Sequence, residues 1–252
     1  MAAVLAESPV GVASSATGRF EVGYVTEDGA EHRVRLDEAW LVPLERALPV
    51  RRFGARKGQR HLSGLWWSAT TGGHVGFESW LERDHLVALD FDPAVTAVAS
   101  QPFWLLWRAG GKVRRHAPDF FARLADGGAL VIDSRPLERI GERDLEAFTA
   151  AGAACARLGW RYAVQGSADP VQAANLRWLA GYRHPRYRIE AAGTVLLEAF
   201  TAPLPLLAGA ASAGDPIAVL PVLSHLLWCR ALTVDLSVPL HDGSRVRIAE
   251  DR

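Results

Sequence analysis

Alternation of apolar and polar residues near the N-terminus predicts a β-hairpin. Phe20 and Val22 precede the turn at 27–29, and further apolar residues follow it with the same two-residue period. This spacing places apolar side chains on one face of each strand, and a Glu-Asp-Gly turn suits a tight connection. We therefore expect a hairpin over 19–36, within an N-terminal hairpin region at 19–50.

The next segment changes from glycine-rich and basic to apolar with a helical period. Residues 51–73 carry five glycines among many basic residues and predict a long functional loop. The adjacent Trp66 and Trp67 fit a core position better than a surface on which DNA rests. Apolar residues then recur every three or four positions, so we expect a helix over 76–90 that stops before Pro93.

Glycine turns divide the centre of the chain into extended runs. A β-rich stretch spans 95–107, a turn follows at Gly110-Gly111, and a second strand is expected over 113–124. The Gly127-Gly128 turn then returns the chain into a strand at 129–134. The last two strands are therefore expected to form a hairpin.

Helical and extended segments alternate after this hairpin. Residue spacing predicts a helix over 141–158 that ends at Gly159, a strand over 160–164 and a helix over 170–180. The order helix, three strands, helix, strand predicts an α/β domain with a mixed sheet flanked by helices. We assign residues 51–195 to this domain.

The C-terminal part of the chain has a different composition. A stretch rich in Ala, Gly and Pro at 203–216 is expected to be a linker. A helix at 218–229 and two short strands at 232–235 and 245–248 are expected after it. A helix followed by a two-stranded wing predicts a small winged-helix-like module over 196–252.

Composition favours a soluble globular protein. The 252-residue chain is 49% hydrophobic and carries 28 basic and 28 acidic residues, so it can bury a full core. Residues 1–18 lack a basic start and are interrupted by Glu7 and Pro9, which predicts a disordered tail. No apolar stretch is long enough to span a bilayer. Cys155 and Cys229 are expected to be buried, reduced thiols of a cytoplasmic protein.

Basic residues gather in three clusters although the net charge is zero. No acid lies between Glu45 and Glu78, and a second cluster leads directly into Asp119. A third cluster lies at 183–188. Three clusters favour contact with a phosphate backbone over three ordinary solvated faces. The residues assigned to DNA binding are Arg51, Arg52, Arg56, Lys57, Arg60, Arg114 and Arg115.

Three acids in the middle of the chain carry the candidate chemistry. Glu82 lies in the expected helix, Asp119 late in one expected strand and Asp133 late in its hairpin partner. An unpaired buried charge is costly, so a carboxylate in an apolar strand must be solvated, paired or bound to metal. Mg²⁺ and Mn²⁺ prefer carboxylate ligands, and such ions activate water for phosphodiester hydrolysis. The pattern predicts a metal-dependent nuclease site, with the Ser134 carbonyl as a further ligand.

Alternative interpretations stay open for several of these residues. Either Asp alone would most often cap a turn, and His116 is more often structural than a contact to water or phosphate. Glu78 lies four residues before Glu82 and is expected on the same helix face, as a surface residue. Arg135 follows Asp133 by two residues and does not deprotonate, but it can clamp a phosphate oxygen while the metal supplies hydroxide. The glycine-rich stretches lack a P-loop ending, so no nucleotide cofactor is expected.

Seven short motifs follow one another along the chain: GLWWSATT at 64–71, FESWLE at 77–82, DFDP at 90–93, QPF at 101–103, HAPDF at 116–120, VIDSRP at 131–136 and NLRWLAGYR at 175–183. In this order they resemble the TnsA-like endonuclease subunits of heteromeric transposases, members of the PD-(D/E)xK restriction-endonuclease-like superfamily. The resemblance runs from about Arg51 to Arg188, and it implies a restriction-endonuclease-like fold.

The resemblance also implies a role for each site residue. Glu82 would be the catalytic acid carried by a helix, and Asp119 the central metal ligand. Asp133 would occupy the position of the second acid or amide, and Arg135 the position of the catalytic lysine. The further site residues expected are Glu78, Gln101 and His116.

In this family the subunit nicks the 5′ ends of a transposon with Mg²⁺, while a separate DDE transposase cuts and joins the 3′ ends. A C-terminal winged-helix-like domain contacts that transposase and an AAA+ regulator. The resemblance therefore implies double-stranded DNA and these two proteins as partners, and no membrane. Two other functions stay open. One is a DNA-binding or assembly protein that has lost its chemistry through Arg135, and the other is a stand-alone nuclease in phage defence.

Overall fold

The computed structural model describes residues 19–51 and 63–249 of the chain. Two expectations fall outside these residues. One is the disordered tail at 1–18, and the other is the part of the first basic cluster formed by Arg52, Arg56, Lys57 and Arg60.

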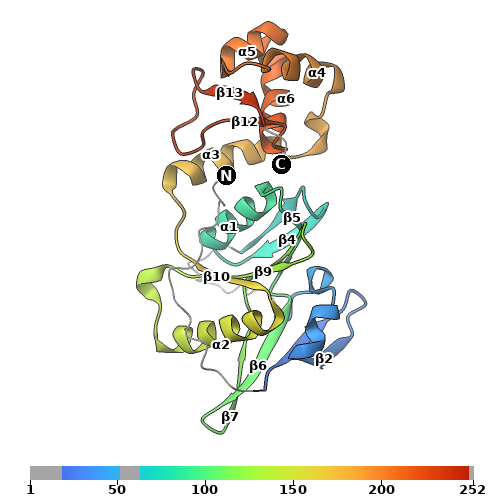
Figure 1. Ribbon diagram of the computed structural model, residues 1–252, viewed down its shortest axis with the longest axis vertical. Helices are drawn as coiled ribbons and strands as arrows, with labels where there is room; N and C mark the ends of the chain where they lie inside the picture. The colour runs from blue at the N-terminus through green and yellow to red at the C-terminus, as the bar shows by residue number, and fades with distance from the viewer. Residues whose placement is uncertain (1–18, 52–62, 250–252) are drawn as a thin grey trace. The chain divides into compact units, whose positions relative to one another are not determined.

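The chain divides into two compact units, residues 1–167 and residues 168–252 (Figure 1). The sequence-based boundary between a nuclease domain and a C-terminal module lies after residue 195. Helix α3 (Pro170–Leu179), expected in the first domain, therefore belongs to the second unit.

An antiparallel sheet in the first unit has the strand order β2-β1-β6-β7. Its strands are β1 (Glu21–Val25), β2 (Glu31–Arg35), β6 (Phe103–Ala109) and β7 (Lys112–His116). The predicted hairpin is confirmed, because Val22 pairs with Val34 and Tyr24 with His32. The 3₁₀ turns η1 (Leu36–Leu41) and η2 (Leu44–Arg46) follow it.

A second sheet of four strands has the order β10-β9-β8-β5. Its strands are β5 (Val95–Ser100), β8 (Phe120–Leu124), β9 (Ala129–Ser134) and β10 (Arg161–Gln165). Strands β9 and β10 are parallel, and the other pairs are antiparallel. The predicted mixed sheet is therefore confirmed, and with it an α/β architecture.

Two of the expected extended runs are each divided between the two sheets. The run at 95–107 breaks at Gln101, whose φ of +47° turns the chain from β5 into β6. The run at 113–124 breaks between β7 and β8, where Pro118 has no N–H to donate to a ladder. Each break separates a strand of one sheet from a strand of the other.

The expected loop at 51–73 is wrong in its second half. Strand β3 (Gly64–Ser68) pairs there with β4 (Gly73–Phe77) in an antiparallel hairpin. Gly72, with φ +66°, supplies the left-handed conformation that the turn requires. Two short paired strands are therefore found where an open loop was expected.

Helix α1 (Trp80–Phe91) begins four residues later than predicted. Residues 76 and 77 belong to β4, and the Ser79 side chain caps the helix by accepting a hydrogen bond from the Glu82 N–H. Glu78 therefore precedes the helix, and the expectation that it shares a helix face with Glu82 is wrong.

Strands β8 and β9 lie between two hydrophobic clusters. Phe121 and Val131 point to one cluster, which includes alanines of α2 (Glu142–Leu158), and Phe120 and Ile132 point to the other, beneath α1. Successive side chains of a strand alternate in direction, so one strand pair serves both cores. The predicted end of α2 at Gly159 is confirmed by its φ of +70°. The 3₁₀ turn η3 (Leu137–Arg139) lies between β9 and α2.

The second unit combines helices with a small sheet. Its helices after α3 are α4 (Glu190–Ala199), α5 (Leu206–Ala213) and α6 (Pro216–Trp228), with the 3₁₀ turns η4 (Ala180–Tyr182) and η5 (Pro185–Tyr187). Its sheet has the order β11-β13-β12, formed by β11 (Leu204–Pro205), β12 (Leu232–Thr233) and β13 (Arg245–Ile248).

The expected linker at 203–216 is wrong, because it contains β11 and all of α5. Alanine is the best helix former, so a run rich in Ala becomes a helix once its leucines pack. Cys155 is buried as expected, but Cys229 is exposed. Within the described ranges no single helix has the length and apolar composition to cross a membrane. Helices α5 and α6, which are bent against each other, reach that length and apolar composition only when they are counted together.

Candidate carboxylate site

Strand pairing brings Asp119 and Asp133 together. Asp119 immediately precedes β8, and Asp133 is the second-last residue of β9. Phe120 pairs with Ile132, so the start of one strand lies beside the end of its antiparallel partner. The expectation that Asp119 lies late in its strand is wrong. Strands of a hairpin are antiparallel, so a residue late in the first strand lies near the turn and a residue late in the second strand lies at the far end.

Asp119 is poorly compensated for a carboxylate whose side chain is only 15% exposed. Its Oδ2 accepts a hydrogen bond of 2.7 Å from the Ser134 N–H, and its Oδ1 lies 4.0 Å from the Arg51 Nη2. Burial raises the pKa of Asp119 well above its ordinary value, and the charges of Asp133 and Glu82 raise it further. Asp133 and Glu82 are therefore close enough to Asp119 to repel its charge.

Glu82 reaches this cluster from the first turn of α1. Its Oε2 accepts a 2.6 Å hydrogen bond from the Glu78 N–H, and its Oε1 accepts a 3.0 Å hydrogen bond from the Ser79 hydroxyl. Glu82 is buried, and burial raises its pKa. Its two oxygens thus complete a capping arrangement at the start of the helix.

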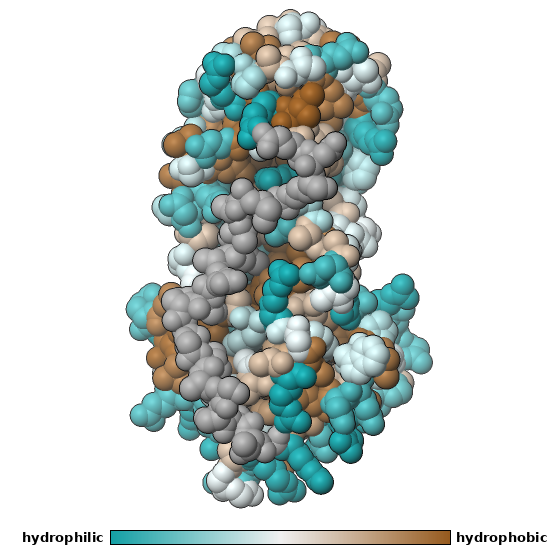
Figure 2. Space-filling model, in the orientation of Figure 1, coloured by the Kyte–Doolittle hydropathy of each residue, from teal (hydrophilic) through white to brown (hydrophobic). Residues whose placement is uncertain are grey.

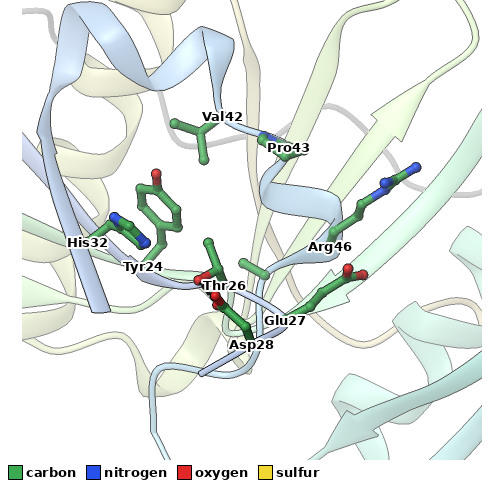
Figure 3. A pocket seen from close by; sticks show the side chains of 9 residues that line it. Tyr24, Thr26, Glu27, Asp28, His32, Val42, Pro43 and Arg46 are labelled. Atoms are coloured by element: carbon green, nitrogen blue, oxygen red, sulfur yellow. Dashed lines mark hydrogen bonds between the residues drawn. The ribbon is translucent and has the colours of Figure 1, made fainter. Parts of the chain in front are cut away.

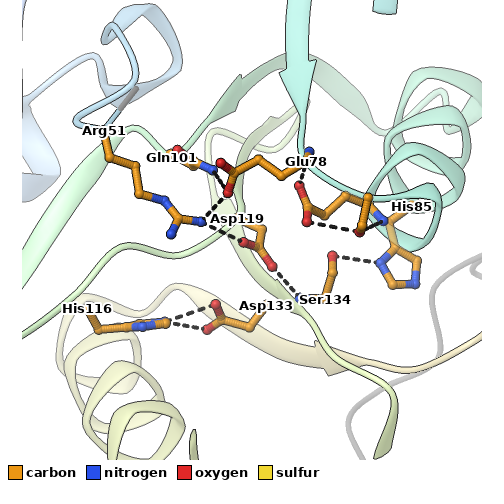
Figure 4. A network of polar contacts seen from close by, with 10 residues as sticks. Arg51, Glu78, His85, Gln101, His116, Asp119, Asp133 and Ser134 are labelled. Carbon is orange, nitrogen blue, oxygen red and sulfur yellow. Dashed lines mark hydrogen bonds and ion pairs between the residues drawn. The ribbon is translucent and has the colours of Figure 1, made fainter. Parts of the chain in front are cut away.

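Asp133 is held on the other side of the cluster by two donors, of which Figure 4 shows His116. The His116 Nε2 lies 2.9 Å from each carboxylate oxygen, and the Tyr162 hydroxyl donates a hydrogen bond of 2.6 Å to Oδ2. Burial and the Asp133 charge raise the pKa of Tyr162, so its hydroxyl remains a donor. His116 therefore fixes a site carboxylate.

Glu78 is a site residue and not the surface residue expected. Its Oε2 accepts a 2.6 Å hydrogen bond from the Arg51 Nη2 and a 2.9 Å hydrogen bond from the Gln101 Nε2 (Figure 4). Gln101 is fully buried, and its backbone N–H donates to the Asp119 carbonyl at 2.9 Å. One glutamine thus links the Glu78 carboxylate to the backbone of Asp119.

Arg135 lies in a different ion pair. Its Nη2 contacts the Asp144 Oδ2 at 3.1 Å, in the first turn of α2.

The hydroxyl of Ser134 donates to the His85 Nδ1 at 2.8 Å, while the His85 Nε2 donates to the Gly166 carbonyl at 2.8 Å. These contacts anchor the end of β9 to α1 and to the segment after β10.

The basic residues expected to bind DNA are placed in part. Arg114 contacts the Glu146 Oε1 at 3.3 Å, and the Arg115 guanidinium lies 4.5 Å from the centroid of the Trp104 ring. Both arginines are exposed on β7, next to the exposed Lys112. Figure 2 shows hydrophilic side chains at the lower end of the visible face, where the β6–β7 hairpin lies in Figure 1.

A hollow of about 380 Å³ lies between the N-terminal hairpin and the 3₁₀ turns η1 and η2 (Figure 3). Tyr24 and His32 stack along one side, with ring centroids 5.3 Å apart, and Arg46 lies on another. The hollow shares no residue with the carboxylate cluster. This hollow and the carboxylate cluster are therefore different places in the first unit.

The carboxylate cluster fits a divalent cation in its chemistry. Its donors are the hard oxygens that Mg²⁺ and Mn²⁺ prefer, and its negative charge is under-compensated. The buried Gln101 Oε1 also has no hydrogen-bond partner. Within residues 19–51 and 63–249, no group of three His, Cys, Asp or Glu side chains has the arrangement of a metal site. Binding would therefore require Glu82 to leave its capping hydrogen bonds.

Several site residues were not identified from the sequence. Tyr162 and His85 carry no local signal, because each acts through a partner distant in sequence. The acid-free basic stretch did mark Arg51, but as a DNA contact and not as a neighbour of Asp119.

No protein-family model matches the chain, and no curated protein matches its sequence.

Proposed function

We propose that this protein is a metal-dependent DNA endonuclease, the 5′-end-cleaving subunit of a TnsA-like heteromeric transposase. One observation carries the proposal. Asp119, at the start of β8, lies between Glu82 of α1 and Asp133 at the end of β9, and burial together with the charges of these two acids raises the pKa of Asp119, beside a mixed sheet flanked by helices. Structural acids are normally paired, so clustered repelling acids favour a functional site. A restriction-endonuclease-like core is the fold in which such a cluster would serve phosphodiester hydrolysis.

Asp119, Asp133 and Glu82 would hold Mg²⁺, or Mn²⁺ in its place. The bound ion would supply charge stabilisation and an activated water. The Ser134 N–H holds one oxygen of Asp119 and leaves the other directed toward Arg51. His116 and Tyr162 keep Asp133 oriented, so its carboxylate needs little reorganisation when substrate arrives.

The second unit supports a winged-helix-like module. Its elements from residue 190 onward follow the order helix, strand, two helices and two strands, and β12 and β13 are antiparallel. A helix, α6, followed by a two-stranded wing is the arrangement expected of such modules. We propose that this module contacts the DDE transposase and the AAA+ regulator.

Arg115 supports DNA as the substrate. Stacking on Trp104 restrains its guanidinium at the surface of β7, while the N–H donors stay available to a phosphate. Arg114 lies on the same strand, which ends at the site residue His116. A basic strand leading into the acidic cluster would guide a phosphate backbone toward it.

The test is nicking of supercoiled plasmid DNA. The purified protein, alone or with its transposase, should nick only when Mg²⁺ or Mn²⁺ is present, and the double variant Glu82→Ala/Asp119→Ala should be inactive. A matched control removes two exposed acids, Asp126 and Glu190, whose partners are Arg161 and Arg188. Equal nicking by wild type and the Glu82/Asp119 variant would refute the proposal.

One observation favours a second candidate, a DNA-binding or assembly factor without nuclease chemistry. Both Glu82 oxygens accept helix-capping hydrogen bonds, and Arg135 is engaged by Asp144. A protein of this kind would bind DNA with unchanged affinity when Asp119 is replaced by Ala, and it would show no Mn²⁺ binding that depends on Asp119. Mn²⁺ titration followed by electron paramagnetic resonance separates the two candidates.

A further inference from the structure

The positive charge beside Asp119 comes from Arg51 and not from Arg135. The Arg51 Nη2 lies 4.0 Å from the Asp119 Oδ1, and Arg51 also lowers the proton affinity of Glu82. Arg135, although only two residues from Asp133 in sequence, pairs with Asp144 at 3.1 Å. The two arginines are otherwise comparable, with side chains 43% and 46% exposed. They therefore differ mainly in the acid that each contacts.

Arg51 is held in place by a chain of hydrogen bonds. The Gln101 Nε2 donates to the Glu78 Oε2 at 2.9 Å, and the Arg51 Nη2 donates to the same oxygen at 2.6 Å (Figure 4). A guanidinium has five N–H donors, so the bond to Glu78 leaves others to reach an anion. The bond to Glu78 therefore restrains the Arg51 side chain without using all of its N–H donors.

The backbone of Gln101 is adapted to this arrangement. Its φ of +47° lies in the left-handed region, which only Gln101 and Arg230 adopt among the described non-glycine residues. Such a conformation is unfavourable for a residue with a side chain, and it persists where the surroundings impose it. Here the Gln101 N–H donates to the Asp119 carbonyl and its carbonyl accepts from the Val50 N–H, the residue before Arg51. Gln101 thus fixes Asp119 and Arg51 at once.

We propose that Arg51 is a catalytic residue of this site and contacts the scissile phosphate, with Glu78 and Gln101 as its positioning residues. The inference rests on the proposed nuclease function. In hydrolysis the oxygen of water bonds to phosphorus, and the bond from phosphorus to the 3′ oxygen breaks with its electron pair on that oxygen. The water proton passes to solvent, and the 3′ oxygen takes up a proton. Arg51 donates hydrogen bonds to the non-bridging oxygens, where charge accumulates, and transfers no proton.

The experiment compares Arg51→Ala, Arg51→Lys and Arg135→Ala in the full chain. Three quantities are measured: the nicking rate of supercoiled plasmid with Mg²⁺ at saturating protein, DNA affinity with Ca²⁺, and Mn²⁺ affinity without DNA. Loss of a preorganised donor to the transition state lowers the rate by about 100- to 1000-fold, so Arg51→Ala should show a loss of this size. Arg51→Lys should regain part of the rate, because the charge returns without the fork of donors.

DNA affinity and Mn²⁺ affinity should change less than about threefold in Arg51→Ala, because a transition-state contact lowers the rate without weakening binding to the same extent. Arg135→Ala should lose less of the rate than Arg51→Ala, and a control at the exposed Arg161, whose partner is Asp126, should nick at the wild-type rate when replaced by Ala. A large loss in Arg135→Ala with none in Arg51→Ala would overturn the assignment. So would an Arg51→Ala variant that binds Mn²⁺ more tightly and nicks normally, because Arg51 would then be only a counter-ion. Wild-type protein that fails to nick, alone or with its transposase, refutes the nuclease function itself.

Discussion

Two aspartates of the first unit, the buried Asp90 and the partly buried Asp119, differ in how the protein compensates their charge. Asp90 accepts hydrogen bonds from the Trp66 Nε1 at 2.9 Å, the Ser68 hydroxyl at 2.7 Å, and the backbone N–H groups of Ala69 and Thr70 at 3.1 and 2.8 Å. These donors come from the β3–β4 hairpin, so Asp90 fastens the end of α1 to that hairpin.

Asp119 has fewer contacts that compensate its charge than Asp90 has. It accepts one backbone hydrogen bond, lies 4.0 Å from a cation, and is repelled by Asp133 and Glu82. A buried carboxylate needs hydrogen-bond donors or cations to compensate its charge. Asp90, with its four hydrogen bonds, has the compensation expected of a structural acid. The contrast supports the proposal that the Asp119 region binds a ligand that brings positive charge.

The largest expected effect is the loss of nicking in Asp119→Ala. A metal-bound site supplies several kcal/mol of transition-state stabilisation, so the rate should fall at least about 1000-fold. Asp90→Ala should nick normally at temperatures where it remains folded. The measurement is plasmid nicking with Mg²⁺. If Asp119→Ala retained the wild-type rate, the two aspartates would not differ in function.

The comparison should reverse when stability is measured. Asp90→Ala leaves four donors of the β3–β4 hairpin without their acceptor, so unfolding free energy should fall by about 3–5 kcal/mol. Asp119→Ala removes an under-compensated charge and should change stability by less than about 1 kcal/mol. Urea unfolding followed by circular dichroism gives both values, and equal destabilisation would remove the contrast.

Mn²⁺ should stabilise the wild-type protein through Asp119. A ligand that binds only the folded state, at 100 times its dissociation constant, adds about 2.7 kcal/mol to the free energy of unfolding. The shift should vanish in Asp119→Ala, and Glu190→Ala serves as the control because that exposed acid pairs with Arg188. Thermal unfolding with and without Mn²⁺ is the measurement. A shift that survives in Asp119→Ala would place the ion elsewhere.

Stability should depend on pH through Asp119. Its pKa is raised in the folded state above the ordinary value of 3.8, so the folded protein binds this proton more tightly than the unfolded chain does. Stability is therefore greatest at low pH and falls as pH rises from 3.8 through the folded-state pKa, by at most about 1.4 kcal/mol per pH unit for this group. Glu82 acts in the same direction. Asp119→Asn should flatten the profile of unfolding free energy, and an unchanged slope would contradict the assignment.

The smallest effect is expected for Tyr162→Phe. This change removes the 2.6 Å hydrogen bond to Asp133 but leaves His116 in place, so stability should fall by about 1–2 kcal/mol. Nicking should fall only severalfold, with no change in DNA affinity. Urea unfolding and plasmid nicking test both expectations, and a loss as large as that of Asp119→Ala would show that His116 alone does not orient the carboxylate.

The elements found from sequence are those with strong local signals. The hairpin at 19–36, the strand at 129–134 and the helix ending at Gly159 are confirmed, because periodicity and turn glycines act within a few residues. The breaks at Gln101 and Pro118 were missed, since no glycine turn marks either of them in the sequence. Which sheet a strand joins depends on partners distant in sequence.

By itself the sequence determined which residue types were available: a mixed α/β pattern, the acids Glu82, Asp119 and Asp133, and a supply of arginines. Only the tertiary structure decided how their charges are paired. It placed Glu78 before its helix beside Arg51, and it turned Arg135 toward Asp144. The physical reason is that electrostatic and hydrogen-bond energies depend on distance in space, whereas sequence patterns report only neighbours along the chain.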